Sequence, residues 1–170
     1  LMEELKAEGL ETDQSVFWET FVARIDTNGR NVSATDLERV YWDANQVFPE
    51  AKIFLERCRR ADLKLYYLTN ASKRNVDGRL KTSVMKEYFA GGLASYAFPF
   101  QKPDPRIYEA LLQKYDLDAD KCMFVDDHAE NVEMAVRLGM RGCILNGPGD
   151  FDRCWESLAR NDQTKTNLLN

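Results

Sequence analysis

The chain has 170 residues, of which 44% are hydrophobic and 30% are charged, a composition typical of one globular domain with a real core. Its formal net charge of -5 leaves no basic face for a nucleic-acid partner. No apolar run approaches the roughly 20 residues of a membrane span, so we expect a soluble protein without a membrane partner. No pattern in the sequence indicates an oligomeric state.

Residues 1–48 are predicted to be helical throughout. Apolar residues recur at helical spacing over 17–25, and Ser33 with Asp36 resembles a capping box ahead of a second helix. Asn28-Gly29 is the expected turn between these helices. A small helical bundle needs its aromatic rings to bury enough surface, so we expect most of them in its core. The rings are those of Phe17, Trp18, Phe21, Tyr41 and Trp42.

Strands and helices alternate after Pro49, which opens a helix at a position where proline is tolerated. Alternation of this kind predicts an α/β fold, a Rossmann-like parallel sheet with flanking helices. The polar residues 162–170 are expected to fray. The expected strands are 63–68, 93–98, 122–125 and 143–145, and the expected helices are 105–115 and 132–138, with helix or loop over 74–90.

The four cysteines form no Cys-x-x-Cys pair. Cys122 and Cys143 lie in apolar, strand-like runs, where a free cysteine behaves as a small buried hydrophobe. We therefore expect reduced thiols and a cytoplasmic location. The first ten residues are acidic and amphipathic, unlike a signal peptide.

The most informative segment is Phe124-Val125-Asp126-Asp127, in which an expected strand leads directly into two carboxylates. A helical pattern then begins at once, and Gly139 is expected to end it. Two carboxylates at the end of a parallel strand repel each other unless a cation or a proton separates them. Oxygen ligands of this kind suit Mg²⁺. Taken alone, Asp127 is explained equally well as a helix cap.

Polar residues also follow the first two expected strands of the sheet. Thr69-Asn70 ends the first strand, and Lys102 follows the second. Ligands of open α/β sheets bind beyond the carboxyl ends of the strands, so these residues are expected to meet Asp126-Asp127 at one edge. Hydrogen-bond donors, a positive charge and ligands for a divalent ion suit a phosphoryl group. Singly, Thr69 is explained as a helix cap and Lys102 as a surface lysine.

Two further residues of the acidic segment have assigned roles. Asn131 lies one helical turn beyond Asp127, so its amide is expected to reach back toward a cation. His128 is the only histidine, and we expect it to face solvent rather than act as a general base.

These motifs resemble those of the haloacid dehalogenase superfamily of hydrolases, over residues 49–149. Leu68-Thr69-Asn70 resembles the second motif of that superfamily, Lys102-Pro103 the third, and Asp126-Asp127-x-x-x-Asn131 the fourth. The resemblance implies a Mg²⁺-dependent phosphatase of a small phosphorylated, sugar-phosphate-like metabolite. The implied phosphate-binding residues are Thr69, Asn70 and Lys102, with Lys102 also catalytic. Asp127 and Asp126 are the implied metal ligands, and Asn131 supports them.

The resemblance also implies a division of the chain. Residues 1–48 resemble the small helical cap that screens the active site in this superfamily, and residues 49–160 resemble its α/β core. Residues 161–170 form a polar tail.

The sequence departs from the family pattern at its start. Family members begin with a strand that ends in Asp-x-Asp, in which the first Asp is the nucleophile. No such strand precedes the helical segment, and Asp116-Leu117-Asp118 follows a helix. We therefore expect the first core strand to be missing and the chain as given to be inactive. Truncation is the expected cause, and a degenerate relative is the rival. The strands that end at Thr69 and Asp126 should then pair directly or leave a gap.

Three other functions are compatible with parts of this pattern. A 2-haloacid dehalogenase, from the metal-free branch of the superfamily, does not keep an Asp-Asp pair. A signalling receiver domain places its acidic pair first in the chain, whereas here the order is Thr69, Lys102 and then Asp126-Asp127. A noncatalytic relative that keeps the fold is the third alternative.

Overall fold

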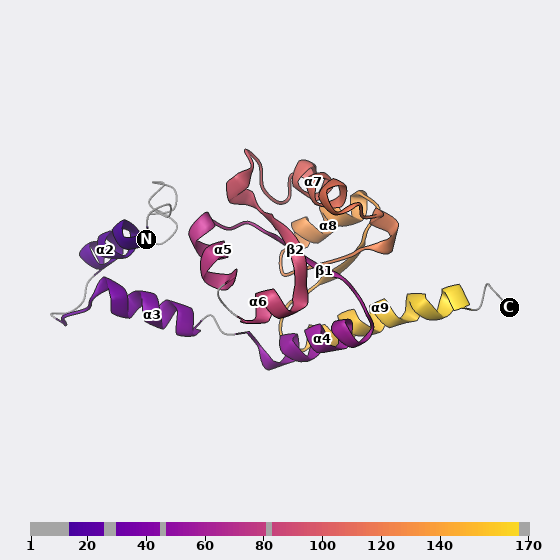
Figure 1. The fold of residues 1–170 in the computed structure, drawn as a ribbon, viewed down its shortest axis with the longest axis horizontal. Coiled ribbons are helices and arrows are strands. Elements are labelled where there is room, and N and C mark those ends of the chain that lie inside the picture. The colour runs from indigo at the N-terminus through magenta and orange to yellow at the C-terminus, as the bar shows by residue number, and fades with distance from the viewer. Residues whose placement is uncertain (1–13, 26–29, 45–46, 81–82, 167–170) are drawn as a thin grey trace.

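The computed structural model describes residues 14–25, 30–44, 47–80 and 83–166. Helices and strands alternate through most of this chain, as Figure 1 shows. The elements are α2 (Gln14–Arg24), α3 (Ala34–Ala44), α4 (Pro49–Arg60), β1 (Leu65–Thr69), α5 (Lys73–Leu80), α6 (Ser83–Tyr88), β2 (Phe89–Ala94), the 3-10 helix η2 (Ser95–Ala97), α7 (Pro105–Tyr115), the 3-10 helix η3 (Ala119–Lys121), β3 (Met123–Asp126), α8 (Ala129–Arg137), β4 (Arg141–Ile144) and α9 (Asp150–Thr166).

All paired strands are parallel, so the predicted α/β fold class is confirmed. β1 pairs with β2, and Thr69 lies opposite Ala94. β3 pairs with β4, and Asp126 lies opposite Ile144. The carboxyl ends of each pair therefore carry the polar residues that the sequence analysis selected.

Among the described strands, β1–β2 and β3–β4 form two separate two-stranded sheets. β1 and β3 are not hydrogen-bonded to each other, so of the two arrangements expected from the sequence, the described residues show the gap. Side chains connect the two sheets instead, at the carboxyl ends of β1 and β3.

Two clusters of buried side chains form the core around the strands. The first joins β1, β2, α7 and α8. It includes Leu68, Leu93, Ile107, Tyr108, Leu111, Ala135 and Met140. The second joins α4, β4 and α9, and contains Phe54, Cys58, Cys143 and Cys154. Helix α9 also contacts α4 through an ion pair of 2.5 Å between Arg57 and Asp152.

Helices α2 and α3 form a hairpin with an aromatic centre, at one end of the molecule (Figure 1). Phe17 and Trp18 are 4% and 3% exposed, and Phe21 and Tyr41 pack against them, as expected for core residues. The Ser33 hydroxyl accepts a hydrogen bond of 3.1 Å from the Asp36 amide, so the N-terminal cap of α3 is also confirmed. Asn28-Gly29 and the side chain of Trp42 lie outside the described residues.

The second strand lies earlier than predicted, because β2 covers Phe89–Ala94 whereas residues 93–98 were expected. Two adjacent glycines, Gly91 and Gly92, hide the strand from a propensity argument. A Cβ added to Gly92 would lie 2.2 Å from the backbone oxygen of Tyr67 on β1. Only glycine therefore allows this close approach of the two strands.

The polar tail also differs from the prediction, because α9 continues to Thr166 instead of fraying from residue 162. No glycine or proline interrupts residues 150–166, so nothing in the backbone chemistry ends the helix earlier. Residues 167–170 lie outside the described part of the chain.

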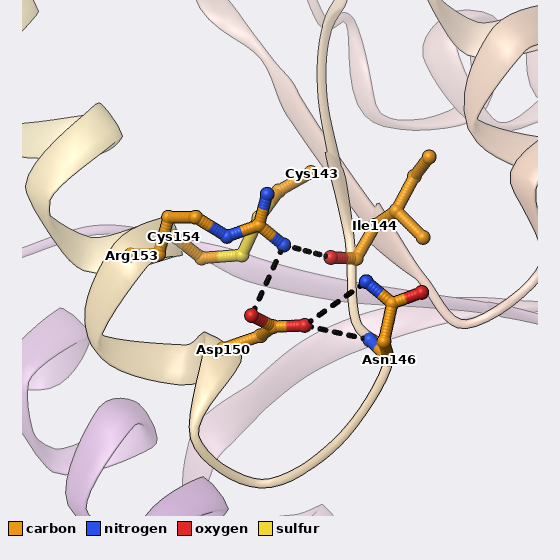
Figure 2. Close-up of a disulfide and its surroundings, with 6 residues drawn as sticks. All are labelled: Cys143, Ile144, Asn146, Asp150, Arg153 and Cys154. Atoms are coloured by element: carbon orange, nitrogen blue, oxygen red, sulfur yellow. Dashed lines mark hydrogen bonds and ion pairs between the residues drawn. A yellow bond between two sulfur atoms is a disulfide. The ribbon is translucent and has the colours of Figure 1, made fainter.

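The prediction of four reduced cysteines is wrong for two of them, because Cys143 on β4 and Cys154 on α9 form a buried disulfide (Figure 2). Their Cα atoms lie 5.9 Å apart. The pairing depends on α9 folding back onto β4, which residue spacing does not reveal. Cys58 and Cys122 are free, and burial raises the pKa of the Cys58 thiol to about 11. The cytoplasmic location stays a prediction, and the disulfide gives it no support.

No helix among the described residues has the length and apolarity needed to cross a bilayer.

We predict that the disulfide stabilises the fold by closing a short loop between β4 and α9. The Cys154→Ala variant should lose about 2–3 kcal/mol of unfolding free energy, measured by urea denaturation, because the crosslink restricts the unfolded chain. Cys122→Ala, which leaves the disulfide intact, is the control. In denatured, unreduced protein we expect two thiols to react with a thiol reagent. Four reactive thiols would disprove the disulfide.

Candidate active site

Asp126 is the most highly connected residue at the carboxyl ends of the strands. It ends β3 and is 9% exposed. Its Oδ2 accepts a hydrogen bond of 2.5 Å from Lys102 Nζ. Its Oδ1 accepts hydrogen bonds of 2.8 Å from Asn131 Nδ2 and 3.0 Å from the His128 amide. Both carboxylate oxygens therefore accept hydrogen bonds, Oδ2 from the Lys102 loop and Oδ1 from the His128 amide and helix α8.

These donors determine the ionisation of Asp126. Burial raises the pKa of its carboxyl group, but the hydrogen bonds from Lys102, Asn131 and the His128 amide outweigh that effect. The pKa of Asp126 therefore lies below its ordinary value, and the residue is a carboxylate at neutral pH.

Lys102 is held at both its backbone and its ammonium group. Its side chain is 9% exposed, and Nζ lies 5.5 Å from the centroid of the Phe124 ring. Its backbone exchanges two hydrogen bonds of 2.9 Å with the side chain of Asn70. A buried lysine held in this way is not the ordinary surface lysine considered in the sequence analysis.

The remaining predicted residues lie beside this network. Thr69 is the last residue of β1 and is half-buried, and Asn70 follows it. Asp127 is exposed and follows Asp126. His128 is exposed as expected, and its Nδ1 lies 3.8 Å from Glu130 Oε1. The structure thus connects Asn70, Lys102, Asp126 and Asn131 by hydrogen bonds, with Thr69 and Asp127 adjacent to them in the chain.

The donor set fits Mg²⁺ bound through one or two carboxylates. Asp127 is exposed, and a carboxylate offers about four lone-pair positions, so the hydrogen-bonded Asp126 still has capacity for a ligand bond. Among the described residues there is no group of three His, Cys, Asp or Glu side chains that could hold a metal. A site here would therefore complete its coordination shell with water and phosphate, which is usual for Mg²⁺.

Asn131 is buried beside Asp126. Its Nδ2 donates to Asp126 Oδ1, and the residue is 5% exposed, so its expected role in supporting a cation site stays a prediction. The Tyr108 hydroxyl, which is also buried, donates to the Asn131 backbone oxygen at 3.0 Å. The sequence analysis did not select Tyr108, although a tyrosine on the apolar face of a helix needs a partner for its hydroxyl group.

The loop after β4 also borders this edge of the strands. The Leu145 amide donates to the Asp126 backbone oxygen at 2.9 Å. Asn146 donates from its backbone and side chain to Asp150, and Arg153 donates to the Ile144 oxygen at 2.6 Å, as Figure 2 shows. The backbone hydrogen bond from Asn146 is the largest cause of the lowered pKa of Asp150. This loop is therefore anchored to the first turn of α9.

Comparisons with known proteins relate this chain to a family of hydrolases. A family model described as "Hydrolase: haloacid dehalogenase-like hydrolase" matches residues 3–139. Phosphatase MT3486 of Mycobacterium tuberculosis (strain CDC 1551 / Oshkosh) is 33% identical over 105 residues, which cover 61% of this chain and 48% of that protein. The (S)-2-haloacid dehalogenase of Pseudomonas sp. (strain YL) is 29% identical over 103 residues, which cover 61% of this chain and 44% of that protein.

A solved structure has a similar fold. It is the HAD family enzyme bt-2542 of Bacteroides thetaiotaomicron, in complex with magnesium and inorganic phosphate. The TM-score is 0.56 at 23% sequence identity, and the match covers 68% of this chain and 62% of that one. This chain spans about half the length of the curated relatives it matches.

We predict that Lys102→Met lowers the unfolding free energy by about 3–5 kcal/mol at pH 7, because it leaves the buried Asp126 carboxylate without its cation. The loss should shrink as the pH falls toward 4. The variant is relieved as its buried Asp126 takes up a proton on acidification, whereas the wild type begins to lose the benefit of its lowered Asp126 pKa only below the ordinary value of 3.8.

Urea denaturation at several pH values measures this difference. Lys121→Met is a matched control, because it removes an exposed pair with Asp118 and should change stability little at any pH. A pH-independent loss in Lys102→Met would contradict the charge argument.

Proposed function

Because this chain belongs to the haloacid dehalogenase-like hydrolases, we propose that it is the core of a Mg²⁺-dependent phosphatase. The proposed substrate is a small phosphomonoester, such as a sugar phosphate. The observation that carries the proposal is the buried Lys102–Asp126 pair next to Thr69 and Asp127, at the carboxyl ends of β1 and β3.

In this proposal, Thr69 and Lys102 bind the phosphoryl group. The Thr69 hydroxyl would donate a hydrogen bond to a phosphoryl oxygen. The Lys102 ammonium has three protons, and its bond to Asp126 uses one of them, so others remain for the substrate. A fixed positive charge at this position would stabilise the negative charge of the transferring group.

We further propose that Asp127 and Asp126 hold Mg²⁺, which when bound neutralises charge on the phosphoryl oxygens. Asn131 would keep the Asp126 carboxylate in a fixed orientation through its 2.8 Å hydrogen bond. The α2–α3 hairpin is proposed as the cap that screens the site.

The aspartate nucleophile is proposed to lie upstream, on a strand that the described residues do not contain. The lack of pairing between β1 and β3 among the described strands supports this idea, because a strand between them would pair with both. The nucleophile would attack phosphorus in line, take the phosphoryl group as the alcohol leaves, and then release it to water.

We predict that a chain extended by such a strand releases phosphate from p-nitrophenyl phosphate. Asp127→Asn should lower this rate on the order of 100-fold or more, because it removes a charged metal ligand. Isothermal titration of Mg²⁺ alone into the same proteins gives a second readout and should show weaker binding in the variant. Asp118→Asn, an exposed carboxylate outside the site, is the control. Equal Mg²⁺ affinity in Asp127→Asn and wild type would exclude Asp127 as a ligand.

The 170-residue chain by itself is predicted to release no phosphate above background, because it lacks the proposed nucleophile. The same p-nitrophenyl phosphate assay tests this at high protein concentration. Turnover that depends on Lys102 would show that a residue within these 170 acts as the nucleophile.

A 2-haloacid dehalogenase is the second candidate, since one of the relatives bears that name. That activity requires no metal ligands, so it leaves Asp127 without a role. Chloride released from (S)-2-chloropropionate by the extended chain, unaffected by EDTA, would favour this candidate over the phosphatase.

A further inference from the structure

We propose that Asn70 is a positioning residue that fixes the Lys102 loop, rather than a ligand of the phosphoryl group. The geometry stands on its own, and only the catalytic role of Lys102 rests on the proposed function. This assignment differs from the one that the sequence motif implied, in which Asn70 binds phosphate.

The contact between these two residues is reciprocal. Asn70 Nδ2 donates to the Lys102 backbone oxygen, and the Lys102 amide donates to Asn70 Oδ1, both at 2.9 Å. A side-chain amide offers a donor and an acceptor side by side without carrying a charge. Aspartate in its place would keep the acceptor but set an oxygen against the Lys102 carbonyl oxygen.

The second half of the argument concerns the far end of the Lys102 side chain. Nζ contacts Asp126 while the lysine side chain is 9% exposed, so the flexible stem is held between two fixed points. Asn70 follows the end of β1 and Asp126 ends β3, and these two described strands are not paired with each other. The chain of contacts from Asn70 through Lys102 to Asp126 therefore links the two strand ends.

Fixing the backbone of Lys102 also helps to fix the position of its ammonium group. Holding the backbone of Lys102 removes the backbone freedom, so that only the side-chain torsions remain to be ordered when the ammonium binds. Asn70 would thus keep the ammonium beside Asp126 before any substrate arrives. One proton of Asn70 Nδ2 remains, so direct contact with phosphate is the rival that an experiment must separate.

NMR of the 170-residue chain tests the proposal without turnover. In Asn70→Ala, we expect the Lys102 amide to exchange with solvent on the order of tenfold faster, because its acceptor is gone. The Lys102 ammonium signal should also broaden or disappear. Asn70→Asp should keep intermediate amide protection, since it retains the acceptor. The Gly92 and Leu145 amides, which have other acceptors, should be unchanged and report that the fold is intact.

Thr69→Ala is the matched variant, because it changes the neighbouring residue at the same strand end. It should leave both Lys102 signals as in the wild type, while weakening the binding of inorganic phosphate measured by titration. Unchanged Lys102 signals in Asn70→Ala would overturn the proposal, and so would an equal acceleration of the Gly92 and Leu145 amides. If no variant changes phosphate binding while Asn70→Ala still shifts Lys102, the proposed function fails and the positioning role stands.

Discussion

The buried ion pair between Lys102 and Asp126 is the interaction on which the site depends. Taking two charges out of water is costly, and the pair is tolerated because each member has further partners. Asn131 and the His128 amide satisfy Asp126, and Asn70 holds the backbone of Lys102. These contacts join two sheets that share no backbone hydrogen bond among the described strands. At the carboxyl ends of β1 and β3, an ion pair therefore adds a polar link to the apolar packing that also joins the two sheets.

The sequence was most informative where local chemistry decides the structure. Helix α7 begins at Pro105 as expected, and the Asp104 carboxylate accepts a hydrogen bond from the Arg106 amide. Strand β3 ends at Asp126, as the sequence also predicted. The parallel α/β class followed from the alternation of elements. The prediction placed strand β2 too late in the chain. Gly92 is required there because β1 approaches it closely, and this contact joins segments that are distant in sequence.

The hydrogen-bond partners of the polar residues could not be predicted from the sequence, because several of them too are contacts between distant segments. The ends of the expected strands predicted that Asn70, Lys102 and Asp126 would share an edge, but not which atoms would bond. The hydrogen bond from Asn131 to Asp126 was likewise not predicted. The link between Cys143 and Cys154 depends on the return of α9 to β4. Membership of the haloacid dehalogenase-like hydrolases, in contrast, was visible in the motifs themselves.

The ion pair between Lys102 and Asp126 affects how an anion binds at the carboxyl ends of β1 and β3. Lys102 and Asp126 balance each other's charge, and the exposed Asp127 adds one negative charge at the carboxyl end of β3. A phosphate ester would be repelled at close range as long as Asp127 stays uncompensated. Under the proposed function, electrostatics would therefore favour binding of the cation at Asp127 before binding of the anion.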